Sequence, residues 1–265
     1  FASSGTYYFK NGEILKKAFN YVVDNDLSLN GEYYVSLAYK YLFEEHLPVS
    51  VYPLQHFMQW GTPEDVNEYL QWSNIFKTFL TPKLDCQSTG ATIIPMAGLG
   101  KRFSDEGYTL TKPLLPVSGL PMVIRATEDL PQTNHYSFVI RSDMKGHEDI
   151  SQTIQKRIPN SVITSLNRTT NGQATSAKIG IDAITDRIGS DSQITIGACD
   201  NGAIYSVDNF QKIVNETKAD VIVWGASGHA NAIRKPEMFG WIEANSTGQI
   251  SRISVKKPLN NPSQD

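Results

Sequence analysis

The sequence is poor in cysteine, in charged residues and in long apolar runs. Of its 265 residues only two are cysteines, Cys86 and Cys199, and they form neither a zinc-binding spacing nor a disulfide framework. The five histidines are scattered and form no metal-binding pair. No apolar stretch approaches the roughly 20 residues that span a membrane, and the first residues lack the basic and apolar regions of a signal peptide. We therefore expect a cytoplasmic protein without a membrane partner.

The charge balance excludes one broad class of partner. The chain has 24 basic and 27 acidic residues and a net charge of -3, whereas general nucleic-acid binders carry a large positive excess. Hydrophobic residues make up 40% of the chain and charged residues only 19%. Such a composition builds a substantial core and is not that of a disordered protein. We expect a folded enzyme with no nucleic-acid partner.

Hydrophobic periodicity predicts several elements in the first 80 residues. The apolar residues of Glu13 to Asp24 fall on one helical face, and a second helix is expected after Asn30-Gly31. Thr62 precedes Pro63 and two acidic residues, a pattern typical of a helix N-terminus, so a third helix should run to about Phe76. Strands are expected at Gly5 to Lys10 and Val49 to Phe57.

The pattern changes after a polar stretch, Thr81 to Gly90, which we predict to be a linker. Beyond it, apolar runs alternate with amphipathic segments, which indicates an α/β fold with a mostly parallel sheet and helices on both faces. The expected strands are Ala91 to Ala97, Tyr136 to Arg141, Val162 to Leu166, Gln193 to Cys199 and Asp220 to Gly225, with a final hairpin of Met238 to Ala244 and Gln249 to Val255. The expected helices are Met122 to Leu130, His147 to Arg157, Ala174 to Ile184 and Val207 to Thr217.

One loop concentrates glycine and positive charge directly after an expected strand. Gly98 and Gly100 let the backbone approach a polyphosphate, and their N–H groups can line an anion-binding nest. Lys101, Arg102 and Lys112 follow, and the planar guanidinium and the ammonium group are both suited to phosphate oxygens. Three cations in one loop of an acidic protein predict an anionic ligand.

Two common phosphate-binding fingerprints do not describe this loop. Phe103 stands where the third glycine of a dinucleotide-binding G-x-G-x-x-G motif belongs. The Gly100-Lys101 pair lacks both the earlier glycine and the following Ser or Thr of a P-loop. An ordinary strand-to-helix turn with a solvated basic stretch remains the structural alternative.

The run G-x-G-x-R followed by K-P, at Gly98, Gly100, Arg102, Lys112 and Pro113, resembles the signature of the sugar-nucleotide pyrophosphorylases and related cytidylyltransferases. Further segments are similar to the same NTP-transferase family. Asn171-Gly172-Gln173-Ala174 resembles its base-recognition segment. Gly197-Ala198-Cys199-Asp200-Asn201 resembles the strand end that carries a metal-binding Asp. Phe239-Gly240-Trp241 and Val255-Lys256-Lys257-Pro258 resemble its acceptor-site strands.

This resemblance implies a Rossmann-like, GT-A-type fold and a nucleotidyltransferase that couples an NTP to a phosphorylated sugar or other small metabolite phosphate, with release of pyrophosphate. It also implies Mg²⁺ as the cofactor and a role in making carbohydrate or capsule precursors. The residues implied as catalytic are Arg102, Lys112 and Asp200. Those implied to bind the nucleotide are Ala97, Gly98, Leu99, Gly100, Lys101, Gly172 and Gln173. Those implied to bind the acceptor are Gly240, Lys256, Lys257 and Glu32, and the implied metal ligands are Asp200 and Gln59.

The motifs stand in an unusual order. The glycine loop is near the N-terminus in the family, whereas residues 1–80 here resemble its C-terminal part, with Gly5-Thr6-Tyr7-Tyr8-Phe9 and Trp60-Gly61-Thr62-Pro63. We expect one permuted domain, made of residues 1–80, a linker at 81–90 and residues 91–265. A piece of a tandem protein is the alternative, and its exposed sheet edge would favour a homo-oligomer or a domain-swapped dimer.

Two departures from the family pattern bear on function. Gln59 stands where a second metal-binding Asp is usual, and Lys256 replaces the Glu of the acceptor site. The lysine favours an anionic or non-hexose acceptor, and Gln173, which can read a pyrimidine edge, favours CTP weakly. A catalytically silent, nucleotide-sensing module is the main functional alternative. A glycosyltransferase of similar fold is disfavoured, because Cys199-Asp200-Asn201 is not an Asp-x-Asp motif.

Overall fold

The computed structural model describes residues 6–51, 53–78, 87–88, 90–189, 191–216 and 219–259, which divide into two compact units. The first unit is Phe1–Ser73 and the second is Asn74–Asp265. The predicted linker falls mostly on residues 81–86 and 89, which lie outside the described residues. The arrangement of the chain as one permuted domain stays a prediction.

The first unit packs short helices around a small apolar core. Helix α1 (Gly12–Asp24) begins at Asn11, whose side chain accepts hydrogen bonds from the backbone N–H groups of Glu13 and Ile14 at 3.1 and 2.9 Å. Helix η1 (Val35–Ala38) and helix α2 (Tyr39–Glu44) follow. The core consists of Ala18, Val22, Ala38 and Leu42, all of them buried.

Helix α3 (Pro63–Thr78) begins where the sequence predicts, and its first turn is closed by a reciprocal cap. The backbone N–H of Asp65 donates to Thr62 Oγ1 at 3.2 Å, and the backbone N–H of Thr62 donates to Asp65 Oδ2 at 3.1 Å. Each bond satisfies a donor that the helix itself leaves unpaired.

Two strand predictions in the first unit are wrong at the described positions. Residues 6–10 form no strand, because their aromatic rings pack instead, Tyr7 against Tyr39 and Phe9 against Phe19 at centroid distances of 6.0 Å. Residues 49–51 and 53–57 also form no strand. The helix expected after Asn30 begins only at Val35.

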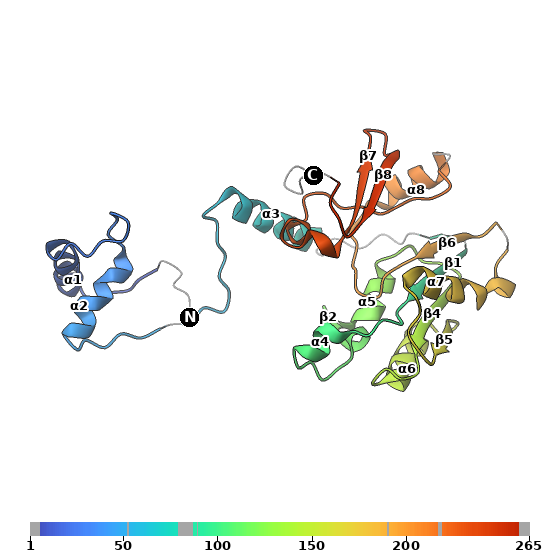
Figure 1. Cartoon of the computed structure of the whole chain (residues 1–265), viewed down its shortest axis with the longest axis horizontal. Coiled ribbons are helices and arrows are strands. Elements are labelled where there is room, and N and C mark those ends of the chain that lie inside the picture. The colour runs from blue at the N-terminus through green and yellow to red at the C-terminus, as the bar shows by residue number, and fades with distance from the viewer. Residues whose placement is uncertain are drawn as a thin grey trace. The chain divides into compact units, whose positions relative to one another are not determined.

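The second unit contains a four-stranded parallel sheet in the order β5-β4-β1-β6 (Figure 1). Its strands are β1 (Gly90–Pro95), β4 (His135–Arg141), β5 (Val162–Leu166) and β6 (Gln193–Ile196). Strand β1 lies between β4 and β6, with Ala91 beside His135 and Ile194. Because all four strands are parallel, their carboxyl ends meet at one edge of the sheet.

Alternate residues of the central strands enter two separate apolar cores. Ile94 and Phe138 pack with helix α5 (Met122–Glu128) and helix α6 (His147–Arg157) on one face. Ala91 and Ile93 pack with residues around Ile184 on the other, where helix α7 (Gln173–Asp182) crosses β1 and β4. The sheet is therefore covered by helices on both faces, as its nearly continuous apolar strands predict.

The remaining elements of the second unit are short. They are α4 (Lys101–Asp105), η2 (Lys112–Leu114), the antiparallel pair β2 (Pro116–Val117) and β3 (Leu120–Pro121), η3 (Thr185–Arg187), α8 (Val207–Glu216), α9 (Ala230–Arg234), η4 (Pro236–Met238) and the hairpin of β7 (Gly240–Ala244) and β8 (Ile250–Val255). The strand predicted at Asp220 to Gly225 is absent, because this run uses Trp224 to pack against Tyr205 and Phe210 at centroid distances of 4.6 and 5.2 Å.

Gly180 lets α7 approach the sheet closely, and we expect Gly180→Ala to destabilise the second unit. A Cβ there would lie 2.6 Å from Ile93 Cγ2 and 3.0 Å from Val139 Cγ2, both in the buried centre of the sheet. Overpacking of this kind typically lowers the free energy of unfolding by about 1–3 kcal/mol. Urea denaturation measures the loss. Gly189→Ala is the matched control, since its Cβ would meet nothing closer than Ser192 Oγ at 3.7 Å. Equal stability of the two variants would contradict the packing argument.

Candidate functional site

A cavity of about 620 Å³ opens at the edge of the sheet where the parallel strands end. Segments that are far apart in the sequence contribute to its wall. They are the loop after β1 (residues 95–100), the stretch 103–113, the end of β4 (Arg141 to Lys145), the segment from Thr169 to Ser176, and Ala198 to Asp200 after β6. The cavity thus lies where parallel α/β sheets bind their ligands.

The glycine loop enters this cavity as soon as β1 ends. Met96 donates its backbone N–H to Val139 O at 2.9 Å, which holds the start of the loop against β4. Gly100 has a φ of +64° and precedes α4, and this left-handed conformation favours glycine. A Cβ on Gly100 would lie 3.8 Å from Lys112 Cβ. The turn therefore brings the backbone of the loop beside the lysine.

Lys112 and Asp200 form an ion pair in the wall of the cavity. Lys112 Nζ forms an ion pair with Asp200 Oδ2, and it also lies 5.8 Å from the centre of the Phe103 ring. The side chains of Lys112 and Asp200 are 26% and 36% exposed, so both remain within reach of a ligand. The pair joins the stretch after α4 to the loop after β6.

Cys199, next to Asp200, is largely buried against the core around Ile94. Burial and, to a smaller extent, the nearby Asp200 carboxylate raise the pKa of the Cys199 thiol to about 11, against a smaller opposing effect of Lys112. A thiol with this pKa is protonated at neutral pH. A protonated thiol does not favour a role for Cys199 as a nucleophile.

The segment before α7 is shaped by a second glycine in an unusual conformation. Gly172 has a φ of +128° and precedes Gln173, the first residue of the helix. The Thr170 hydroxyl donates to Gly172 O at 2.9 Å, and it lies 2.7 Å from the Ser176 hydroxyl, with which it shares a hydrogen bond. These contacts fix the turn, so that both Gly172 and Gln173 line the cavity.

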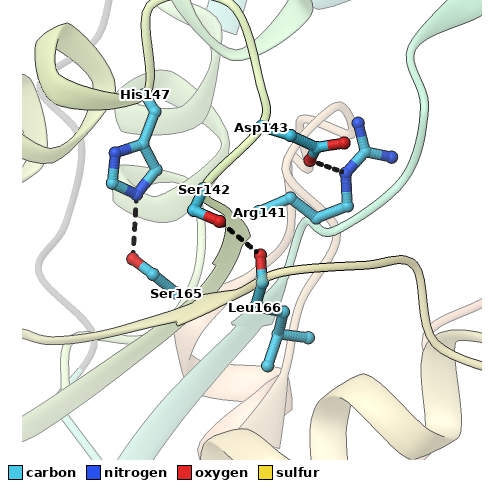
Figure 2. Close-up of polar contacts among 6 residues, drawn as sticks. All are labelled: Arg141, Ser142, Asp143, His147, Ser165 and Leu166. Carbon is cyan, nitrogen blue, oxygen red and sulfur yellow. Dashed lines mark hydrogen bonds and ion pairs between the residues drawn. The ribbon is translucent and has the colours of Figure 1, made fainter.

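The end of β4 contributes polar residues that the sequence analysis did not single out (Figure 2). Arg141 Nε donates to Asp143 Oδ1 at 2.7 Å, while the Ser142 hydroxyl donates to Leu166 O at 3.1 Å. His147 Nε2, at the start of α6, and Ser165 Oγ, on β5, lie 2.8 Å apart. Arg141, the last residue of an apolar strand, carries no motif, so only its place in the sheet brings it to the cavity.

The structure gathers part of the predicted site at this cavity. The predicted residues that line the cavity are Ala97, Gly98, Leu99, Gly100, Lys112, Gly172, Gln173 and Asp200. Lys101 and Arg102 are exposed on α4 and are not among the lining residues. Gly240, Lys256 and Lys257 belong to the β7–β8 hairpin and its end. Glu32 and Gln59 belong to the first unit, where Glu32 accepts a hydrogen bond from the Tyr34 hydroxyl at 2.6 Å.

The donor set of the cavity bears on the predicted Mg²⁺. Within the described ranges, no group of three or more His, Cys, Asp or Glu side chains could hold a metal ion. Mg²⁺ usually takes one or two protein carboxylates together with water and substrate phosphates. Asp200 alone satisfies that need, so the residues present fit a metal that enters with a nucleotide rather than one held in a protein cage.

Comparison with known proteins supplies an independent finding. The family model described as nucleotidyl transferase matches residues 91–264. No curated protein matches the chain. Among the described residues, no helix has the length and apolar character that crossing a membrane requires.

Solved structures with a similar arrangement include two of bacterial origin. One is a nucleoside-diphosphate-sugar pyrophosphorylase from Vibrio cholerae RC9, with 19% identity, a TM-score of 0.43, and coverage of 64% of this chain and 68% of that one. The other is an inositol-1-phosphate CTP transferase from T. maritima, with 15% identity, a TM-score of 0.47, and coverage of 63% and 64%. The chain thus spans 68% of the length of the first structure and 64% of the length of the second.

Proposed function

Because the chain belongs to the nucleotidyl transferase family, we propose that it couples an NTP to a small phosphorylated metabolite and releases pyrophosphate. One observation carries the proposal: a single cavity is lined by the glycine loop, by Gly172 and Gln173, and by the facing charges of Lys112 and Asp200. A flexible glycine backbone and a lysine suit a polyphosphate, while an amide side chain suits the edge of a base.

The chemistry requires no general base. A phosphate monoester has a second pKa near 6, so its oxygen is ionised at neutral pH and attacks the α-phosphorus directly. The new P–O bond forms as the bond to the β-phosphate bridging oxygen breaks, and pyrophosphate leaves with that electron pair. Catalysis then rests on positioning and charge neutralisation. Lys112 would hold phosphate oxygens, and Mg²⁺ on Asp200 would supply further positive charge.

The identities of the two substrates are finer proposals. Gln173 at the start of α7 offers a donor and an acceptor for a pyrimidine edge, and we favour CTP. Lys256, which replaces the Glu of the family pattern, favours an anionic or non-hexose acceptor, and Lys257 would meet the phosphate of that acceptor.

A pyrophosphate-release assay tests the function. Each of CTP, UTP, dTTP, GTP and ATP would be paired with sugar, polyol and amino-alcohol phosphates in the presence of Mg²⁺. We expect release with one NTP and one acceptor class. Nucleotide binding without turnover in every combination would instead favour the catalytically silent, nucleotide-sensing alternative.

The proposed role of Asp200 predicts a metal-dependent defect in Asp200→Asn. The substitution is isosteric and should leave the fold intact, but it removes the negative charge that favours Mg²⁺. Loss of a residue that merely supports a metal ligand typically weakens metal affinity about 10- to 100-fold, so the Mg²⁺ concentration for half-maximal activity should rise at least as much. Asp182→Asn is the control, since that carboxylate pairs with Lys178 on α7, away from the cavity. Undiminished activity of Asp200→Asn at limiting Mg²⁺ would rule out its role as a ligand.

A further inference from the structure

Arg141 is a buried cation that the proposed chemistry does not use. It is 5% exposed, although arginine is seldom buried unless it is fully paired. It lines the cavity, and its Nε donates to the carboxylate of Asp143, whose side chain is 62% exposed. This bond uses the single donor of Nε and helps to orient the guanidinium.

One of the other guanidinium donors lacks an acceptor. Arg141 Nη1 is completely buried and has no hydrogen-bond partner within the described part of the chain. Leaving a buried donor without an acceptor costs more free energy than a typical hydrogen bond contributes, and the cost is larger for a charged group. Thr111 Oγ1, on the same cavity wall, is also buried and unpaired. Two such atoms beside one cavity are positions at which a ligand can form hydrogen bonds.

The order of the strands in the sheet indicates which part of a bound nucleotide would lie near Arg141. Strand β4 lies between β1, which leads into the glycine loop, and β5, which leads into the segment with Gly172 and Gln173. Adjacent strands are about 4.8 Å apart. Helix α7, which begins at Gln173, crosses β1 and β4. A nucleotide with its phosphates on the glycine loop and its base at Gln173 would therefore have its ribose and the adjoining edge of its base near the end of β4.

We propose that Arg141 Nη1 donates to the O2 carbonyl of a pyrimidine base and so helps to select pyrimidine nucleotides. This inference rests on the proposed function. O2 is the pyrimidine acceptor closest to the ribose, as the position of β4 requires. A neutral carbonyl also suits the local charge better than a phosphate does, because Asp143 already neutralises the guanidinium and would repel an anion. In Figure 2 the two terminal nitrogens of Arg141 point away from Ser142 and His147 and are free of both.

A thermodynamic cycle between one side chain and one ligand atom tests the proposal. Binding of CTP and of 2-thio-CTP would be measured calorimetrically in Mg²⁺ for the wild type and for Arg141→Met, with UTP and 2-thio-UTP as a second pair. Sulfur at position 2 is a weak acceptor, so the thio substitution should weaken binding to the wild type about ten- to a hundredfold, the range for a hydrogen bond to a charged group. In Arg141→Met the oxo and thio nucleotides should bind equally. Arg157→Met is the matched control, since Arg157 Nε also binds a carboxylate, that of Glu128, but outside the cavity.

Each result separates this inference from the proposed function. If replacing O2 by sulfur weakens nucleotide binding equally in the wild type and in Arg141→Met, the proposed contact with O2 is overturned. Binding of ATP or GTP but of neither pyrimidine nucleotide would overturn it as well, while leaving nucleotidyl transfer intact. If no NTP binds the wild type, the proposed function itself fails. If Arg141→Met does not fold, Arg141→Lys keeps the charge and shortens the reach, and it must also lose the difference between CTP and 2-thio-CTP.

Discussion

Lys112→Ala is expected to lower kcat about 10²- to 10³-fold, the usual loss when one preorganised donor to a developing negative charge is removed. Lys112 is already placed for this role, because its Nζ faces Asp200 within the cavity and its Cβ lies beside the glycine loop. Charge builds on the transferred and leaving phosphate oxygens as the reaction proceeds, so the defect should be larger in kcat than in substrate binding.

Steady-state pyrophosphate release at saturating substrates measures this effect. Lys112→Arg keeps the charge and should retain part of the activity. Lys178→Ala is the control, because Lys178 pairs with Asp182 on the exposed side of α7, and it should act like the wild type. Normal turnover of Lys112→Ala would mean that the lysine only neutralises Asp200.

Arg102→Ala is expected to lower kcat/KM about 10²- to 10³-fold as well, through a different route. Arg102 is exposed on α4 and is not among the residues that line the cavity. Its guanidinium must therefore turn toward the phosphates when a nucleotide binds, so part of the loss should appear in KM. Arg102→Lys keeps a cation but loses the planar pair of donors, and its defect should be smaller but clear.

Stability measurements complete the Arg102 experiment. The thermal midpoint of Arg102→Ala without ligand should equal that of the wild type, because an exposed side chain contributes little to folding. Arg187→Ala, at another exposed arginine of the same unit, should change neither midpoint nor activity. Unfolding of Arg102→Ala would assign the residue a structural role and remove it from the site.

The parts of the fold with regular hydrophobic periodicity could be predicted closely. Helix α6 has the predicted bounds, His147–Arg157, because Ile150 and Ile154 repeat at helical spacing and become fully buried. The hairpin of β7 and β8 also lies where alternation and a glycine turn predict it. In both cases, neighbours along the chain determine the structure.

Runs of β-prone residues were less informative where aromatic contacts dominate. Tyr7 and Phe9 contact rings of the first unit, and Trp224 contacts Tyr205 and Phe210, without forming a strand. β-propensity mainly expresses how well a side chain packs on a pleated surface. The same aromatic rings can pack equally well against other rings outside a sheet, and a single sequence does not reveal which of these contacts forms.

The residues of the candidate site were also only partly predictable from the sequence. The glycine loop and the segment at Gly172 were recognisable as motifs, since local backbone conformation requires those residues. Arg141 was not, because a charged residue at the end of an apolar strand usually marks the point where the strand meets solvent. Its burial follows from the placement of β4 between β1 and β5, which depends on pairings between distant segments.

The central position of β1 also affects how the protein is made. Strand β1 pairs with β6 through residues about a hundred positions apart, from Gly90 to Gln193, and a ribosome adds roughly 5–20 residues per second. The edge of β1 that pairs with β6 therefore waits about 5–20 s for its partner strand to be synthesised. Strands β4 and β5 are closer in sequence, with Ser137 beside Val162, and can pair earlier. During synthesis, β1 can therefore pair with β4 before β6 exists.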